Sequence, residues 1–129
     1  MDINALSGEF FAAYEELGRY DAAQEDFAEA AAKANDVSVR EEANETHALY
    51  AQTVTKMNTR LRNIMERVYK YARVHEGENS EIDKVLEKNK QKRPVSSMEA
   101  IEVMTALRSI YRDRMMGRRH LIGERDNYR

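Results

Sequence analysis

The sequence has no cysteine, a single proline and only five glycines among its 129 residues. The absence of cysteine excludes disulfides, thiolate metal sites and cysteine catalysis. With so few turn-forming residues, a sandwich or barrel of short strands is not expected. Strong helix formers such as alanine, glutamate, arginine and methionine dominate instead. Because the length suits a single domain, we predict an all-α protein that forms one structural domain overall.

Long apolar runs are also missing from the chain. No segment approaches the ~20 apolar residues that a membrane-spanning helix needs. The first residues, "MDINALSGEFF", lack the basic start and the apolar stretch of a signal peptide. We therefore expect an intracellular (cytoplasmic) protein, or one that acts within an assembled particle, and we expect no membrane partner.

Charge is abundant, but the two halves of the chain carry opposite signs. Residues 1–53 hold twelve acidic and three basic side chains, a net charge of −9. Residues 54–129 hold eighteen basic and eleven acidic side chains, a net charge of +7. Such an asymmetry predicts attraction between the halves, within one chain or between chains, and an anionic partner is a further alternative.

Residues 1–36 predict an acidic helical hairpin. A first helix is expected over residues 7–17, with Gly18 as its C-terminal stop. A second helix is expected over residues 21–34, with Asp21 as its N-cap. The side chains expected to pack the two helices together are aromatic, apolar or small: Phe10, Tyr14, Leu17, Gly18, Tyr20, Ala23, Phe27 and Ala30.

The last five of these residues have a spacing that resembles the second half of a tetratricopeptide repeat. The resemblance covers residues 7–34 and implies a tight antiparallel hairpin. A shift by the 34-residue period replaces the turn glycine with Gln52 and the two alanines with Met57 and Ile64. We therefore do not expect an array of repeats with a concave peptide groove.

Residues 37–77 predict one long helix, spanning about 38–76, in which Ser38 and Glu41 form a capping box. Its apolar residues recur at alternating steps of four and three, which is a heptad pattern. The residues of this seam are Tyr50, Val54, Met57, Leu61, Ile64, Val68 and Tyr71. Such a helix is roughly 58 Å long, whereas a compact chain of this size has a radius of gyration near 14 Å. The seam therefore needs cover from the chain's own helices or from another copy, and we predict a homo-oligomer or a larger protein assembly.

Residues 78–95 predict a short, highly charged helix followed by a basic linker. Asn79 or Ser80 is expected to cap this helix, which continues to about Lys90. Pro94 then stops the linker.

Residues 96–129 predict a C-terminal helix and a basic arm. Ser96 and Glu99 match a second capping box, and Gly117 is expected to end the helix. We expect residues 112–129 to be mobile in the free protein and to bind an anionic partner. Arginine suits phosphate and carboxylate alike, and the arginines assigned to this role are Arg108, Arg112, Arg114, Arg118, Arg119, Arg125 and Arg129.

Catalytic patterns are not found. None of the three histidines follows a glutamate by three residues, as the histidine ligands of di-iron bundles do. No glycine-rich phosphate loop is present, and Ser96 and Ser97 have no nearby histidine. We predict no enzyme, no catalytic residues, no metal, no cofactor and no small-molecule substrate.

The sequence is therefore interpreted as a non-enzymatic helical assembly or adaptor protein. It would act as a subunit of a larger complex through the heptad seam and the arginine-rich arm. One alternative is a nucleic-acid-binding accessory factor that uses the basic C-terminal half. Another is a small acidic inhibitor, of the kind that viruses direct against host machinery, which mimics nucleic acid or blocks a protein surface.

Overall fold

A computed structural model describes the backbone of residues 2–127 and the side chains of residues 2–75 and 77–116. The described residues form four helices and no strand, which confirms the all-α class. The helices are α1 (Ile3–Lys33), α2 (Val37–Glu76), α3 (Ser80–Lys90) and α4 (Ser97–Asn127).

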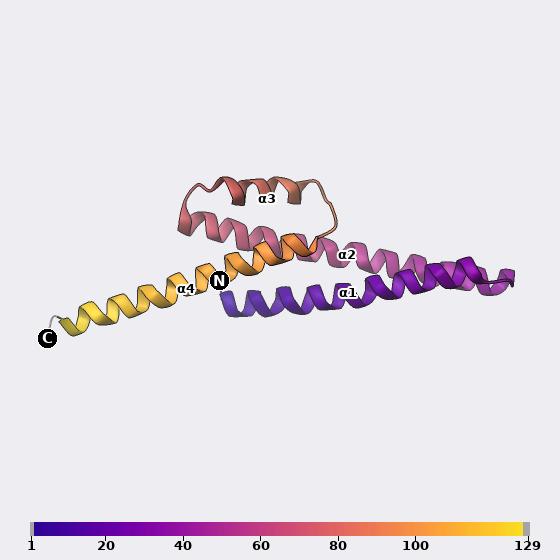
Figure 1. The fold of residues 1–129 in the computed structure, drawn as a ribbon, viewed down its shortest axis with the longest axis horizontal. Coiled ribbons are helices and arrows are strands. Elements are labelled where there is room, and N and C mark those ends of the chain that lie inside the picture. The colour runs from indigo at the N-terminus through magenta and orange to yellow at the C-terminus, as the bar shows by residue number, and fades with distance from the viewer. Residues whose placement is uncertain (1, 128–129) are drawn as a thin grey trace.

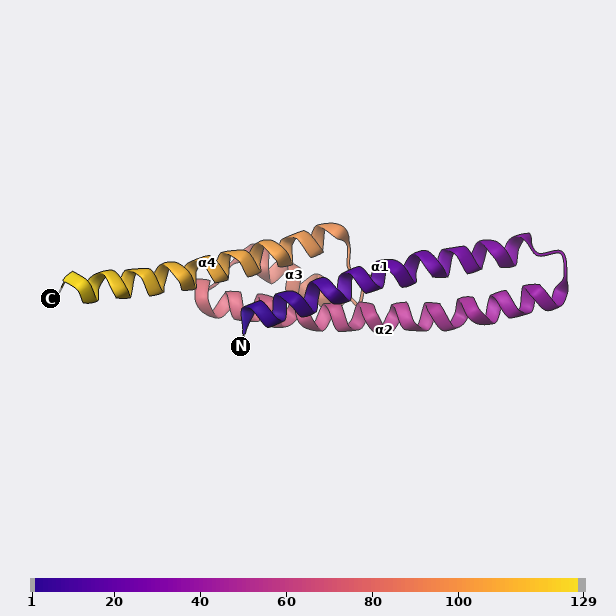
Figure 2. The same ribbon diagram turned by 90° about the horizontal axis from the view of Figure 1, so that it is seen from below.

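The long helices α1 and α2 form an antiparallel pair that extends beyond the rest of the molecule (Figures 1 and 2). The shorter α3 lies against the C-terminal half of α2, and α4 packs at the same end against both α2 and α1. We call this end, where all four helices pack together, the body. The opposite end, where α1 and α2 turn around residues 34–36, contains only these two helices, and we call it the hairpin tip.

One ladder of apolar side chains explains why α1 packs along α2. Its members recur at alternating steps of three and four, which keeps them on one face of a helix. They are buried or half-buried and comprise Ile3, Leu6, Phe10, Ala13, Leu17, Tyr20, Phe27 and Ala31. The polar Gln24 occupies the remaining position of the ladder. In the body, this face joins one continuous core with α2, α3 and α4.

The predicted hairpin within residues 7–34 is wrong, and with it the structure implied by the tetratricopeptide resemblance. Helix α1 continues through Gly18 without a break, and the chain reverses at residues 34–36. The physical reason is that the apolar ladder continues on both sides of Gly18, so burial against α2 favours an unbroken helix. A single glycine inside a helix costs only about 1 kcal/mol relative to alanine.

We expect Gly18→Ala to increase the free energy of unfolding by about 0.5–1 kcal/mol, because alanine restricts the unfolded chain and favours the helix. Gly18 is exposed, and an added Cβ meets no atom within 4 Å. Urea denaturation measures the change. Gly77→Ala provides the contrast, because Gly77 has φ 79 at the end of α2 and its replacement is expected to destabilise. A destabilised Gly18→Ala variant would contradict the continuous helix.

The helix caps agree with the sequence analysis at two of the predicted positions. The backbone N–H groups of Glu81 and Ile82 donate to Asn79 Oδ1, so Asn79 caps α3. At the start of α4, the N–H of Glu99 donates to Ser96 Oγ at 3.2 Å and the N–H of Ser96 donates to Glu99 Oε2 at 3.4 Å, as the capping box requires.

The other two starts differ from the predictions. Asp2 caps α1, five residues before the expected start at Ser7. Asp36 caps α2 by accepting from the N–H of Ser38 at 2.8 Å, so the predicted box of Ser38 and Glu41 does not form. Aspartate is as good an N-cap as serine, and Asp36 lies two residues before Ser38, in the turn itself.

The predicted end of the last helix at Gly117 is also wrong, because α4 continues to Asn127. Good helix formers such as Arg118 and Arg119 follow the glycine directly, and they favour continuation. Arg118, Arg119 and Arg125 therefore lie in α4 rather than in an irregular arm, and Arg129 lies outside the described residues. Within the described part of the chain, no helix combines the length and the apolar character needed to cross a membrane.

Candidate functional site

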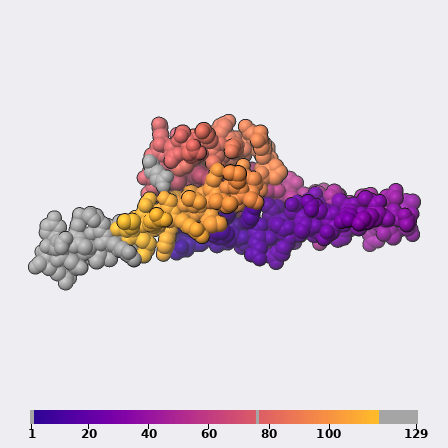
Figure 3. All heavy atoms as spheres, in the orientation of Figure 1, coloured from indigo at the N-terminus to yellow at the C-terminus, as the bar shows by residue number. Residues whose placement is uncertain are grey.

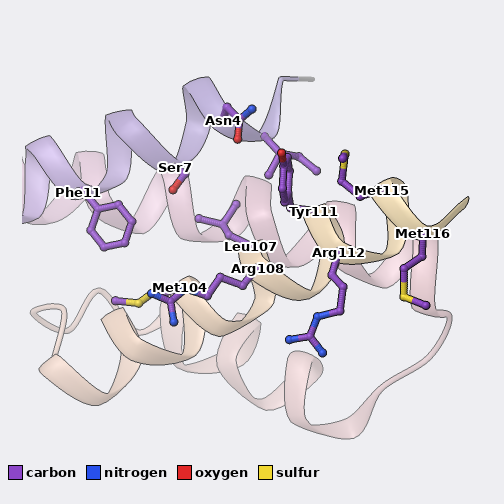
Figure 4. A pocket seen from close by; sticks show the side chains of 11 residues that line it. Asn4, Ser7, Phe11, Met104, Leu107, Arg108, Tyr111, Arg112, Met115 and Met116 are labelled. Carbon is purple, nitrogen blue, oxygen red and sulfur yellow. The ribbon is translucent and has the colours of Figure 1, made fainter. Parts of the chain in front are cut away.

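The N-terminal part of α1 and the middle of α4 lie side by side and enclose an open groove of about 530 Å³ (Figure 4). Most of its lining is apolar, with three methionines and two aromatic rings. The lining residues are Ile3, Asn4, Ser7, Phe11, Met104, Leu107, Arg108, Tyr111, Arg112, Met115 and Met116. We call this feature the α1–α4 groove.

The groove forms because the two helices use only part of their apolar surface against each other. Leu107 is 3% exposed and forms the floor, whereas Phe11, Tyr111 and Met116 remain 41%, 45% and 61% exposed. Figure 4 shows Leu107 and Tyr111 pointing toward α1. Methionine side chains are flexible and polarisable and adapt to different partners. The surface is therefore well suited to contact an apolar stripe of another helix.

Two arginines border this apolar surface. Arg108 and Arg112 lie one helical turn apart and both are exposed. Among the described side chains, neither forms an ion pair. Arg114 has a different environment, because its guanidinium carbon lies 4.9 Å from the centre of the Tyr71 ring on α2. Two of the predicted anion-binding arginines thus lie together at the groove, and Arg114 packs on another side of α4.

The acidic half of the chain has few partners within the molecule. In the ion pairs of the described residues, Glu9 is its only member that contacts the basic half. Glu9 Oε1 lies 3.3 Å from Arg67 and 3.9 Å from Arg60, both on α2. Glu29 pairs locally with Lys33. The remaining acidic side chains lie mainly along the hairpin tip, and none of them forms an ion pair within the described residues.

The hairpin tip also exposes large apolar side chains. Val37, Val39 and Leu49 at the start of α2 are 66%, 54% and 65% exposed. Glu41, Glu42 and Glu45 lie among them and are also exposed. The space-filling view shows the tip extending away from α3 and α4, so no other described element covers it (Figure 3).

The predicted heptad seam is buried within a single chain. Leu61, Ile64 and Val68 are at most 1% exposed, and Val54, Met57 and Tyr71 pack against the same core. Toward the tip, the centroid of the Tyr50 ring lies 5.5 Å from the ring centroid of Tyr20 and 5.1 Å from that of Phe27, both on α1. The cover that the seam needs therefore comes from the chain's own helices, and its central residues are not accessible to a second copy.

The residues predicted to pack a hairpin have other environments. Phe10 and Leu17 are buried in the body, and the Tyr14 hydroxyl donates to Ser97 Oγ of α4 at 3.2 Å. Ala23 is half-buried, whereas Ala30 is exposed like Gly18.

The α1–α4 groove was not among the predicted sites, although the sequence of α4 contains a signal for it. The apolar residues of α4 include the buried Val103, Leu107 and Ile110 and also Met104 and Tyr111. This set covers a wider arc of the helix than one packing partner needs. The excess apolar surface on α4 was therefore visible in the sequence, but its second wall on α1 was not.

A second, smaller groove of about 340 Å³ separates α3 from α4, and Tyr69 of α2 lines it together with Val85 and Ile101. The Tyr69 side chain is buried, and its hydroxyl has no hydrogen-bond partner among the described residues. Burial raises the pKa of Tyr69 above its ordinary value, and the nearby carboxylates of Glu102 and Glu99 raise it further.

We expect Tyr69→Phe to increase the free energy of unfolding by about 1 kcal/mol, because it removes a buried hydroxyl that lacks a partner. The raised pKa also has a consequence at high pH. The unfolded chain ionises its tyrosines near pH 10, whereas folded Tyr69 stays neutral. Above this pH the unfolded state loses a proton that the folded state keeps. The free energy of unfolding is therefore unaffected by Tyr69 ionisation below about pH 10 and falls as the pH rises further. Denaturation of both proteins between pH 8 and 11 should show a shallower loss for Tyr69→Phe. Equal slopes would contradict this environment for Tyr69.

Within the described side chains, no three histidine, aspartate or glutamate residues gather as a metal site would require. The chain matches no protein-family model, and no curated protein and no solved structure is significantly similar to it.

Proposed function

We propose that this protein is a non-enzymatic assembly or adaptor protein that binds other proteins through the α1–α4 groove. The observation that carries the proposal is the combination, on one surface, of exposed apolar side chains with Arg108 and Arg112, which form no ion pair with any described side chain. Exposed apolar surface that is bordered by polar groups is characteristic of protein interaction sites and ligand-binding grooves. Arginine and aromatic residues are also enriched where proteins bind each other.

The chemistry of the groove supports one class of ligand above others. An amphipathic helix can place an apolar stripe on the methionines and aromatic rings while acidic side chains reach the arginines at the border. The sequence alone predicted binding through the heptad seam. Because the central residues of the seam are buried, we assign binding to the groove instead.

Binding of two synthetic peptides tests this proposal. One is a 16-residue helical peptide with leucine at steps of three and four and glutamate elsewhere, and the other carries lysine in place of glutamate. We expect fluorescence anisotropy to show binding of the acidic peptide and at least tenfold weaker binding of the basic one. The Arg108→Glu/Arg112→Glu variant should reverse this preference. Equal affinities for both peptides, or none for either, would contradict the proposal.

Nucleic acid is the second candidate partner, and the exposed Tyr111 between the two arginines favours it, because bases stack on aromatic rings. Duplex DNA, single-stranded DNA and RNA oligonucleotides at two salt concentrations test this alternative. Binding to phosphates should weaken steeply, with a slope of about −0.9 per phosphate neutralised on duplex DNA. Tight binding with such a slope would favour nucleic acid over the acidic helix.

A further inference from the structure

We infer that the α1–α4 groove binds the hairpin tip of a second copy of this chain, so that molecules associate head to tail. This inference rests on the proposed function and names the partner. It follows from the chemistry of two surfaces that the fold places at opposite ends of one molecule (Figure 1).

The exposed face of the tip has the composition of an acidic amphipathic helix. Val39, Glu42 and Leu49 lie at steps that keep them within an arc of about 80° on α2, beside its apolar seam. Val39 and Leu49 are both more than half exposed. They stand about 15 Å apart along the helix axis. Glu45 lies next to this stripe, and neither Glu42 nor Glu45 forms an ion pair within the described residues.

The groove offers the complementary pattern at a similar scale. Met104 and Met115 mark its length along α4 and are about 17 Å apart along the axis. Arg108 and Arg112 are four residues apart, or about 6 Å along α4, and Glu42 and Glu45 are three residues apart, or about 4.5 Å along α2. A tip helix laid along α4 therefore brings both carboxylates to both guanidinium groups while Val39 and Leu49 cover the methionines.

The two surfaces cannot meet within one molecule. Tyr71 of α2 marks the groove end of the molecule, because Arg114 of α4 packs over its ring. Glu42 is 29 residues away on the same straight helix, or about 44 Å. This distance is several times the screening length of about 8 Å at physiological ionic strength. The opposite charges of the two ends can therefore be neutralised by contact only between molecules.

The two contact surfaces are different, so the association is heterologous. Each molecule would offer one tip and one groove, and a dimer would still have a free tip and a free groove. Association is therefore expected to continue into longer, open chains as the protein concentration rises.

The solution mass of the full chain tests this directly. We expect light scattering at about 200 µM to give an average mass well above the 15.0 kDa of one chain, and raising the salt from 50 to 500 mM should lower it. The groove variant Arg108→Glu/Arg112→Glu and the tip variant Val39→Ser/Leu49→Ser should each remain at the mass of one chain. All four positions are exposed, and circular dichroism checks that both variants remain folded.

Mixing the two variants distinguishes a head-to-tail contact from a symmetric one. The groove variant keeps an intact tip, and the tip variant keeps an intact groove, so an equimolar mixture should form one complex of two chains that grows no further. A symmetric contact between two grooves or two tips would give no such rescue. A mixture that stays monomeric, or a wild type that stays monomeric at 200 µM, would overturn the inference.

Matched controls change the same kinds of side chain elsewhere. Lys56→Glu/Lys88→Glu makes the same charge change at exposed positions outside the groove, and Val74→Ser removes an 82% exposed valine of α2. Both should assemble like the wild type, and assembly lost in either would overturn the assigned surfaces. The peptide experiment separates the two proposals: a monomeric wild type that still binds the acidic peptide would refute the second copy as partner and leave the proposed function standing.

Discussion

Leu61→Asp is expected to unfold the protein rather than to separate subunits. Leu61 is 0% exposed and belongs to the core that the helices form within one chain. A carboxylate at this position would be buried without a partner, which costs about 5 kcal/mol or more. A domain of this kind has only about 5–15 kcal/mol of total stability. We therefore expect circular dichroism to show loss of cooperative unfolding or a midpoint lowered by tens of degrees.

The same substitution at Leu49 provides the control, because Leu49 lies on the same helix and is 65% exposed. Leu49→Asp should change the free energy of unfolding by less than about 0.5 kcal/mol. If Leu61→Asp instead gave a folded monomer from an oligomeric wild type, the seam would be an interface between copies. That result would contradict the intramolecular core.

The sequence predicted those elements whose signal is local or repeated many times. The long helix α2 was expected over residues 38–76 and spans Val37–Glu76. Seven seam residues at heptad spacing determine it, and no glycine or proline interrupts the pattern before Gly77. The short α3 and the start of α4 were located by caps, which depend on two or three neighbouring residues.

The errors arose where a local signal competes with burial. Gly18 and Gly117 are both possible helix stops by local criteria, yet both lie inside helices. For Gly18, the decisive signal was the apolar ladder from Ile3 to Ala31, which is visible only when the glycine is not treated as a boundary. The groove was even harder to predict, because its two walls are about a hundred residues apart in the chain.

The division of the molecule into a body and a tip has a thermodynamic consequence, which two phenylalanines of the same helix test. Phe10 is 1% exposed and lies in the body, where its ring stacks on Tyr14 with centroids 6.1 Å apart. Phe27 is half-buried near the tip, where its ring contacts Tyr50. The two positions share residue type and helix, and they differ in how many elements surround them.

We expect Phe10→Ala to lower the free energy of unfolding by about 3–5 kcal/mol, as is usual for a phenylalanine removed from a closed core. Phe27→Ala should cost less, about 1–2 kcal/mol, because part of its side chain already contacts water and two helices can close around the gap. Urea denaturation of both variants measures the difference. Equal costs would contradict a core that is concentrated in the body.

Hydrogen exchange tests the same prediction separately for each region of the molecule. Regions with few buried contacts open locally without unfolding of the whole chain. Phe27→Ala should therefore accelerate exchange at the end of α1 and the start of α2 while the amides of the body keep their protection. Phe10→Ala should lower protection in α1, α2 and α4 together, because these helices share one core. Loss of protection throughout the body in Phe27→Ala would show that the tip and the body unfold as one unit, against the division proposed for them.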